Sequence, residues 1–224
     1  NAVPQAGLDH SVPGLGITKL DEYFDYFGFG KKTGIPLANE QEGVVPSPEW
    51  KEEVFDEPWR LGNTYHTSIG QFGWQVTPLQ MLVAYGALGN GGRFFVPQVI
   101  KDSEPEFVDK ELDLKSLEVV REGMHMTTFA DRGTALALGR QVIPIAAKSG
   151  TAEIGAGNQF VNSWAAGYFP YEDPQYAFIL MMDKAPRSNR LGATTIMGDV
   201  VTWMSENTPE YLSLPALEDD TEVY

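Results

Sequence analysis

The sequence predicts an α+β fold in which a three-stranded antiparallel sheet is flanked by helices. The hydrophobic period changes at residue 142, and three extended apolar segments follow at 143–153, 160–169 and 175–183. The links between these segments are short and rich in turn residues, which is typical of antiparallel neighbours. A helical stripe over 192–206 then follows and is expected to lie on the sheet.

The N-terminal part of the chain predicts one short helix between irregular segments. Residues 1–17 are rich in Gly and Pro and show no period, so we expect an irregular lead-in. A helix follows over 19–27, with Thr18 as its N-cap and Gly28 as a left-handed stop. Frequent Gly and Pro then predict a long loop over 28–63, of the kind that is functional or packed over a core.

The second predicted helix has the clearest start in the sequence. Thr77-Pro78-Leu79-Gln80 combines a capping box with proline at the first helical position, and Asn90-Gly91-Gly92 ends the helix. Its expected buried stripe is Leu79, Leu82, Val83 and Gly86. A short extended piece at 94–97 follows, and the charged residues 102–113 are typical of a surface segment.

Two more helices flank the sheet in sequence. The first is predicted over 116–130, with its stripe formed by Leu117, Val120, Met124 and Thr127. The second, over 192–206, has an expected buried stripe of Ala193, Ile196, Met197, Val200, Val201 and Met204. Between them, the 175–183 segment is apolar on both faces, which predicts a central strand.

Composition excludes several classes of function. The chain has 224 residues, with 16 Lys plus Arg against 31 Asp plus Glu and a formal net charge of −15, so it lacks the basic surface that nucleic-acid binding requires. It has no cysteine, and its three histidines lie far apart, so we expect no metal site and no cofactor. The longest apolar run, Tyr176–Met182, is far shorter than the roughly 20 residues that span a bilayer.

One motif carries candidate chemistry: Lys148-Ser149-Gly150-Thr151, inside the first strand of the sheet. A Lys-[Ser/Thr]-Gly strand occurs in active-site serine acyl enzymes. The glycine lets an extended substrate approach the strand edge, the hydroxyls can hold a carboxylate, and the lysine supplies positive charge. If only the Lys-Ser-Gly tripeptide is considered, a lysine at a strand edge with no catalytic role remains the simpler interpretation.

The other motif matches are weaker. A second copy, Lys32-Thr33-Gly34, lies in a Gly-rich loop and fits a turn with Gly34 at positive φ, and this loop lacks the spacing of a phosphate-binding loop. No serine is followed three residues later by lysine, so a Ser-x-x-Lys nucleophile motif is absent from the sequence. Ser205-Glu206-Asn207 matches Ser-x-Asn by letters alone, because it falls at a surface helix end.

Seven segments occur in one order along the chain: FGFGKKTGIPL (27–37), VPSPEW (45–50), SIGQ (68–71), VTPLQ (76–80), ALGNGG (87–92), GTA (133–135) and AKSGTA (147–152). As an ordered set they resemble the transpeptidase domain of penicillin-binding proteins, and best the class B, elongation-type peptidoglycan D,D-transpeptidases. The resemblance runs from Leu15 to Met204. It implies the fold of penicillin-binding proteins and serine β-lactamases, with 1–212 as the C-terminal part of a transpeptidase domain. The acid-rich residues 213–224 are expected on composition to form a disordered tail.

The resemblance implies a role for each residue of the strand motif. Lys148 would shape the electrostatics and proton traffic of the site as its catalytic residue. Ser149, Gly150 and Thr151 would bind the substrate, the two hydroxyls holding the stem peptide's terminal carboxylate, which the carboxylate of penicillin imitates. The N–H of Thr151 would be one donor of the oxyanion hole. A twist or bulge near Gly150 is expected, because alternation otherwise points Lys148 and Thr151 to opposite faces.

The departures from the family pattern imply a partial site. In the family, the Ser-x-x-Lys and Ser-x-Asn motifs precede the region matched here, so this chain is expected to be inactive alone. The parent protein is expected to lie outside the cytoplasm, anchored to the cytoplasmic membrane by a segment absent here, and to bind stem peptides and β-lactams but no nucleic acid. With its second wall missing, the 148–151 edge is expected to be exposed and to favour self-association.

Three alternative functions remain open on the sequence: a β-lactam sensor or binding module, a β-lactamase, and a non-catalytic scaffold related to penicillin-binding proteins. The loop over 28–63 and the region 68–80 favour a penicillin-binding protein over a β-lactamase. The sequence upstream of this chain would distinguish the other two alternatives, because a sensor retains the Ser-x-x-Lys motif and a scaffold has lost its nucleophile.

Overall fold

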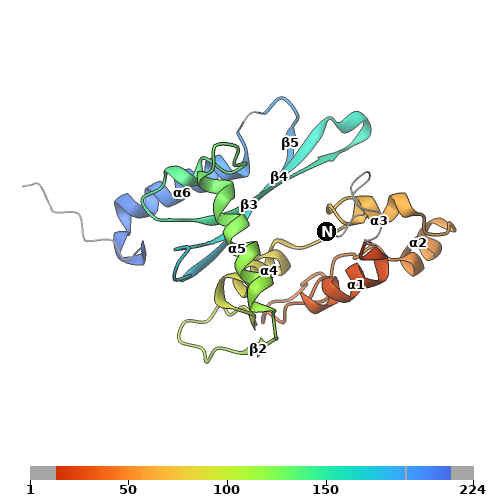
Figure 1. Ribbon diagram of the computed structural model, residues 1–224, viewed down its shortest axis with the longest axis horizontal. Helices are drawn as coiled ribbons and strands as arrows, with labels where there is room; N and C mark the ends of the chain where they lie inside the picture. The colour runs from red at the N-terminus through yellow and green to blue at the C-terminus, as the bar shows by residue number, and fades with distance from the viewer. Residues whose placement is uncertain (1–13, 190, 213–224) are drawn as a thin grey trace, which may run out of the picture. The chain divides into compact units, whose positions relative to one another are not determined.

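The computed structural model describes residues 14–189 and 191–212, which form two compact units (Figure 1). The first unit contains the described residues up to Ala84 together with Val96–Pro105, and the second contains Tyr85–Phe95 and the described residues from Glu106 onward. The predicted acidic tail at 213–224 lies outside the described residues, as does most of the lead-in predicted at 1–17.

The first unit begins with helix α1 (Gly16–Tyr26), three residues earlier than predicted. Thr18 lies inside this helix and is not its cap; Leu15 is the N-cap and makes no side-chain capping bond. The predicted stop is confirmed, because Gly28 has φ +84° just beyond the helix end.

The long loop predicted over 28–63 is wrong, because two helices begin within it. These are α2 (Pro48–Phe55) and α3 (Leu61–Thr67). The start of α2 is well specified locally: the Ser47 hydroxyl accepts a hydrogen bond from the N–H of Trp50, and Pro48 occupies the first turn. The many Gly and Pro residues around this short helix favour a loop. The helix start signal at Ser47-Pro48 is nevertheless present in the sequence.

Helix α4 (Pro78–Asn90) starts with the predicted capping box. The Thr77 N–H donates to Gln80 Oε1 at 2.9 Å, and the Gln80 N–H donates to Thr77 Oγ1 at 3.1 Å. The predicted stripe is only half-buried, whereas Ala84 and Ala87 are buried. Period alone could not select the buried side, because α4 is apolar around most of its circumference.

The second unit contains the three-stranded sheet predicted from the sequence. Strands β3 (Ala146–Ile154), β4 (Phe160–Phe169) and β5 (Tyr176–Pro186) are antiparallel in the order β3-β4-β5. The prediction of a central last strand is wrong for the described sheet, in which β4 is central. An apolar pattern on both faces of a segment therefore does not identify the central strand.

Helices cover both faces of this sheet (Figure 1). Helix α6 (Ala193–Asn207) packs on the face of Ala147 and Ala165, as predicted, through Ala193, Met197 and Val201. Helix α5 (Leu114–Phe129) packs on the opposite face, where Met124 contacts Ala146 and Tyr168. Both expected stripes need one correction: Val120 and Val200 are exposed, since α5 buries Thr128 and α6 buries Gly198 instead.

Short elements complete the second unit. Strands β1 (Arg93–Phe95) and β2 (Phe107–Asp109) form an antiparallel pair, so the predicted extended piece is confirmed and the predicted surface segment contains a strand. The 3-10 helices of the described residues are η1 (Leu138–Arg140), η2 (Ala156–Asn158) and η3 (Pro209–Leu212). No helix within the described ranges is long and apolar enough to cross a bilayer.

A partly buried carboxyl group lies in the first unit. Asp21 of α1 has a buried oxygen, Oδ1, that lacks a hydrogen-bond partner among the described residues. Burial, assisted by the nearby charge of Glu49, raises the pKa of Asp21 to about 6 from an ordinary value of 3.8. Because the folded pKa is the higher one, the ionised carboxylate costs stability, fully above pH 6 and less as the pH falls towards 3.8.

We therefore expect Asp21→Asn to stabilise the protein at neutral pH. Allowing for solvent screening at this partly exposed site, the gain is about 1 kcal/mol. The gain should disappear at about pH 4, where the native carboxyl is already protonated. Urea denaturation at both pH values measures the difference, and an Asn variant that is less stable than the parent at neutral pH would refute this account.

Candidate active site

The strand motif lies on the edge of the described sheet, because β3 pairs with β4 and with no other strand in the described ranges. Lys148 and Thr151 are exposed, and Ser149 and Gly150 are half-buried. The expected exposure of this edge is therefore confirmed, while the roles of its residues in chemistry stay predictions.

Hydroxyls of another element satisfy the outward carbonyl groups along the free edge of β3 only as far as residue 147. In an antiparallel ladder, alternate residues direct both N–H and C=O away from the partner strand. Hydroxyls of α5 satisfy the first two outward carbonyls: Thr128 donates to the Ile145 oxygen at 2.9 Å, and Thr127 to the Ala147 oxygen at 2.7 Å. Helix α5 thus covers the start of the edge and leaves the motif beyond it uncovered.

Beyond Ala147, the outward groups belong to Ser149 and Thr151. The Lys148 ammonium donates to the carbonyl oxygen of Ser149, so the lysine side chain folds over the edge of its own strand. The N–H of Thr151 points away from β4 by the same alternation. An extended ligand that pairs with β3 would find the outward N–H groups of Ser149 and Thr151 here, and would replace the Lys148 ammonium at the Ser149 carbonyl oxygen.

Thr134 joins the motif, and sequence reasoning assigned it no role. The Ser149 hydroxyl donates to Thr134 Oγ1 at 2.7 Å, which links the strand to the turn after α5. Gly133 permits this turn, because a Cβ at that position would lie 2.3 Å from the Thr127 carbonyl oxygen. Only the Gly133-Thr134-Ala135 segment of the sequence could have indicated this partner, and its spacing from Ser149 gives no sign of contact.

The bulge expected near Gly150 is absent. The β3–β4 register is continuous from Ala146 to Ile154, with Gly150 opposite Trp164, and the irregularity lies instead between Val161 and Ser163 in the β4–β5 pairing. Ser149 and Thr151 therefore share one face of β3, and Lys148 belongs to the other. The length of the lysine side chain, rather than a kink in the strand, lets its ammonium reach the edge at Ser149.

The second Lys-Thr-Gly segment lies in a loop with Gly34 at positive φ, as predicted. Gly34 has φ +86°, and the Glu40 carboxylate accepts hydrogen bonds from the Thr33 hydroxyl at 2.6 Å and the Thr33 N–H at 2.7 Å. The Thr33 hydroxyl is thus engaged within the loop. Gln80 holds the same region through bonds from its side-chain amide to the carbonyl oxygens of Lys31 and Glu42.

Two further kinds of candidate site remain, the Ser205-Glu206-Asn207 match and a metal site. Ser205 and Asn207 bond backwards to α6 carbonyls, at Thr202 and Trp203, as a helix end does. Among the described residues, no group of three or more His, Cys, Asp or Glu side chains could hold a metal ion.

A family model described as the penicillin binding protein transpeptidase domain matches residues 11–201 of the chain. Among curated proteins, the peptidoglycan D,D-transpeptidase MrdA of Escherichia coli K12 is 30% identical over 214 residues, which cover 84% of this chain and 33% of that protein. MrdA of Acinetobacter baumannii is 33% identical over 149 residues, covering 62% of this chain and 22% of that protein. The chain thus spans about a third of the length of the first of these relatives.

Solved structures show the same similarity. The chain matches penicillin-binding protein PBP2 of Helicobacter pylori, solved in complex with MreC, with a TM-score of 0.76 and 31% identity over 89% of this chain and 37% of that one. It matches PBP2 of Pseudomonas aeruginosa, solved in complex with WCK 5153, with a TM-score of 0.73 and 29% identity over 87% of this chain and 45% of that one.

Proposed function

Since this chain belongs to the family of penicillin-binding protein transpeptidase domains, of the class B elongation type, we propose that its protein cross-links peptidoglycan stem peptides through a serine acyl-enzyme and binds penicillin. The observation that carries this proposal is the open edge of β3, where Lys148 and Thr151 are exposed and the strand pairs with β4 alone within the described residues. We place the protein's site of action outside the cytoplasm, where peptidoglycan is assembled.

Each group on the open edge has a chemical task in this proposal. The hydroxyls of Ser149 and Thr151, on one face of β3, hold the terminal carboxylate of the stem peptide or of penicillin. The Lys148 ammonium adds positive charge where that carboxylate binds. The outward N–H of Thr151 donates to the oxyanion that forms when the nucleophile attacks. The ligand backbone pairs with β3 as an added strand.

Replacement of Thr151 tests the carboxylate contact in the whole protein that carries this chain. We expect Thr151→Val to slow acylation by a fluorescent penicillin about tenfold, because it removes one hydrogen bond to a charged group and keeps the N–H and the branched shape. Thr202→Val is the matched control, since Thr202 is an exposed α6 residue bonded to Gln141. Equal acylation rates for parent, Thr151→Val and control would refute the assignment.

The 224-residue chain itself should not form a covalent penicillin adduct. No serine in it has a lysine three residues on, and the Ser149 hydroxyl donates to Thr134 instead of to a base. Intact-mass measurement after incubation with penicillin should therefore show the unmodified mass. A stoichiometric mass gain on a single serine would contradict the proposed division of roles, in which β3 binds the ligand and another segment supplies the nucleophile.

A further inference from the structure

The hydroxyl of Thr134 contacts the strand motif from a different element of the second unit. It accepts a hydrogen bond from the Ser149 hydroxyl at 2.7 Å, and among residues 14–189 and 191–212 it has no other hydrogen-bond partner. Thr134 is exposed and Ser149 is half-buried, so this pair of hydroxyls lies at the protein surface. The roles proposed above for the residues of β3 leave Thr134 without one.

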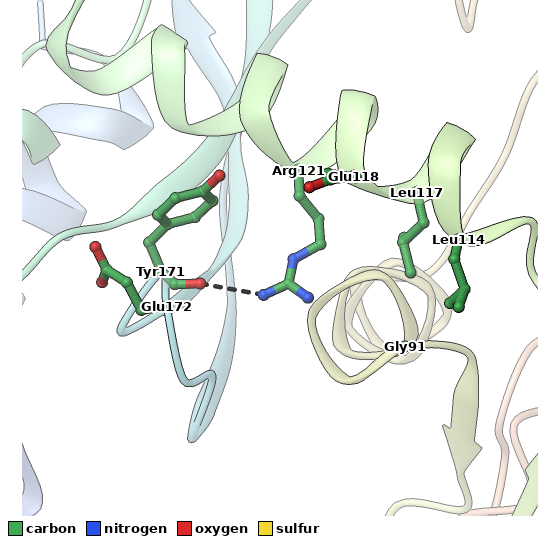
Figure 2. Close-up of a pocket in the computed structure, with 7 residues that line it drawn as sticks. All are labelled: Gly91, Leu114, Leu117, Glu118, Arg121, Tyr171 and Glu172. Atoms are coloured by element: carbon green, nitrogen blue, oxygen red, sulfur yellow. Dashed lines mark hydrogen bonds between the residues drawn. The ribbon is translucent and has the colours of Figure 1, made fainter.

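Helix α5, which ends shortly before Thr134, is fixed to the sheet at several points. The guanidinium of Arg121 donates from Nε to the Tyr168 hydroxyl of β4 and from Nη2 to the Tyr171 carbonyl oxygen, both at 3.1 Å. Figure 2 shows the second of these bonds, which joins α5 to the turn after β4. Together with the two threonine hydroxyls of α5 that bond to the edge of β3, these bonds hold the end of the helix against the sheet.

The turn that carries Thr134 is closed on both sides of that residue. The Gly133 N–H donates to the Ala130 carbonyl oxygen at 2.7 Å, and the Ala135 N–H donates to the Thr127 carbonyl oxygen at 2.9 Å. Ala135 is also fully buried. The backbone therefore fixes the position of the Thr134 side chain, independently of its bond to the strand.

The two hydroxyls carry two hydrogens, and the bond between them uses only one. A hydroxyl donates one hydrogen bond and has two acceptor lone pairs. When Ser149 donates to Thr134, the Thr134 hydrogen is left without an acceptor in the described part of the chain. If both hydroxyls rotate about their C–O bonds, Thr134 donates to Ser149 and the Ser149 hydrogen becomes available. No heavy atom moves in this exchange.

A carboxylate bound at Ser149 favours the second arrangement. An ionised carboxylate only accepts hydrogen bonds, so Ser149 must donate to it. A hydrogen bond from Thr134 to the Ser149 oxygen polarises the Ser149 hydroxyl and strengthens its bond to the anion. The Thr134 hydroxyl thus makes Ser149 a better donor and directs its hydrogen away from the turn.

We propose that Thr134 is a positioning residue for the ligand carboxylate and acts through Ser149. In the free protein Ser149 donates to Thr134; in the complex Thr134 donates to Ser149, and Ser149 donates to the carboxylate. Thr134 itself does not touch the ligand. This inference rests on the function proposed for β3, and it makes the preference for a free C-terminal carboxylate depend on the turn after α5.

Amide NMR titration of the 224-residue chain tests the inference, with Gly150 and Thr151 as reporters. The ligands are N-acetyl-D-alanyl-D-alanine and its C-terminal amide, and we expect the parent to bind the free acid more tightly. Thr134→Val keeps the branched shape without a hydroxyl, so it should weaken binding of the free acid about fivefold and leave binding of the amide unchanged. Thr134→Ser, which restores the hydroxyl, should bind both peptides as the parent does. The matched control is Thr202→Val on α6, which should change neither.

A double variant separates positioning from direct contact. Because Thr134 acts through Ser149, the variant with both Ser149→Ala and Thr134→Val should bind the free acid no more weakly than Ser149→Ala alone. Three results would overturn the inference: losses that add in the double variant, equal free-acid binding by Thr134→Val and the parent, or equal weakening of both peptides by Thr134→Val. A parent chain that binds the two peptides equally would instead refute the carboxylate contact proposed for β3, and this inference with it.

Discussion

Replacing Gly167 by alanine is expected to destabilise the second unit by about 3 kcal/mol. Gly167 lies in β4, and a Cβ there would be 2.1 Å from the Ala146 carbonyl oxygen and 2.9 Å from the Ala147 Cα. Both obstacles are backbone atoms, so no side-chain rotation relieves them. The strand that carries the candidate site must move away from β4, which breaks part of the ladder. A lowered urea midpoint and faster amide exchange in β3 would report this loss.

Gly123→Ala is the matched control for this substitution. Gly123 lies in the interior of α5, is exposed, and a Cβ there would meet nothing within 4 Å. Alanine should therefore stabilise the helix by about 0.5–1 kcal/mol. A Gly167→Ala variant as stable as the parent would show that β3 and β4 are not as close as the structure has them.

Replacing Lys51 by methionine is expected to cost the first unit about 2 kcal/mol. The Lys51 side chain is buried, and its ammonium donates to the Pro58 carbonyl oxygen at 2.9 Å and to Asn63 Oδ1 at 3.2 Å. It also pairs with Glu57 at 3.0 Å. One cation thus joins α2 to the link that follows it and to the start of α3. Methionine keeps the apolar stem but leaves these acceptors without their donor.

Lys32→Met is the control for the buried lysine. Lys32 is an exposed residue of the same unit, and its replacement should leave the urea midpoint almost unchanged. Glu57→Gln should cost less than Lys51→Met, because Glu57 is exposed and the two uncharged acceptors keep their donor. Equal urea midpoints for Lys51→Met and Lys32→Met would show that the hydrogen bonds of the Lys51 ammonium do not stabilise the first unit.

The sheet could be predicted from the sequence because each of its signals is local. Period, turn residues and the stripe of α6 place the three strands and the last helix within a few residues of their observed bounds. The order of the strands could not be predicted in the same way, since β5 is apolar on both faces yet is not the central strand of the described sheet. Helices α2 and α3 were missed because both are short and are surrounded by Gly and Pro, which outweighed the capping signal at Ser47.

The candidate site also has parts that the sequence indicates and parts that it does not. The Lys-Ser-Gly-Thr motif is contiguous, so the sequence could indicate it. The Ser149–Thr134 bond and the hydroxyls of α5 that cover Ala147 join residues 15 and 20 positions apart, which only the folded chain brings together. The expected bulge at Gly150 is wrong because Lys148, on the opposite face from Ser149 and Thr151, reaches the edge through the length of its side chain.

The central claim is that the open edge of β3 binds the carboxylate end of a D,D-peptide. Amide NMR of this chain with N-acetyl-D-alanyl-D-alanine at millimolar concentration tests it most directly, with the C-terminal amide of the same peptide as control. We predict weak, saturable shifts at Ser149, Gly150 and Thr151 that are largely lost when the carboxylate is replaced by the amide. Shifts of equal size with both peptides, or none at these three residues, would contradict the claim.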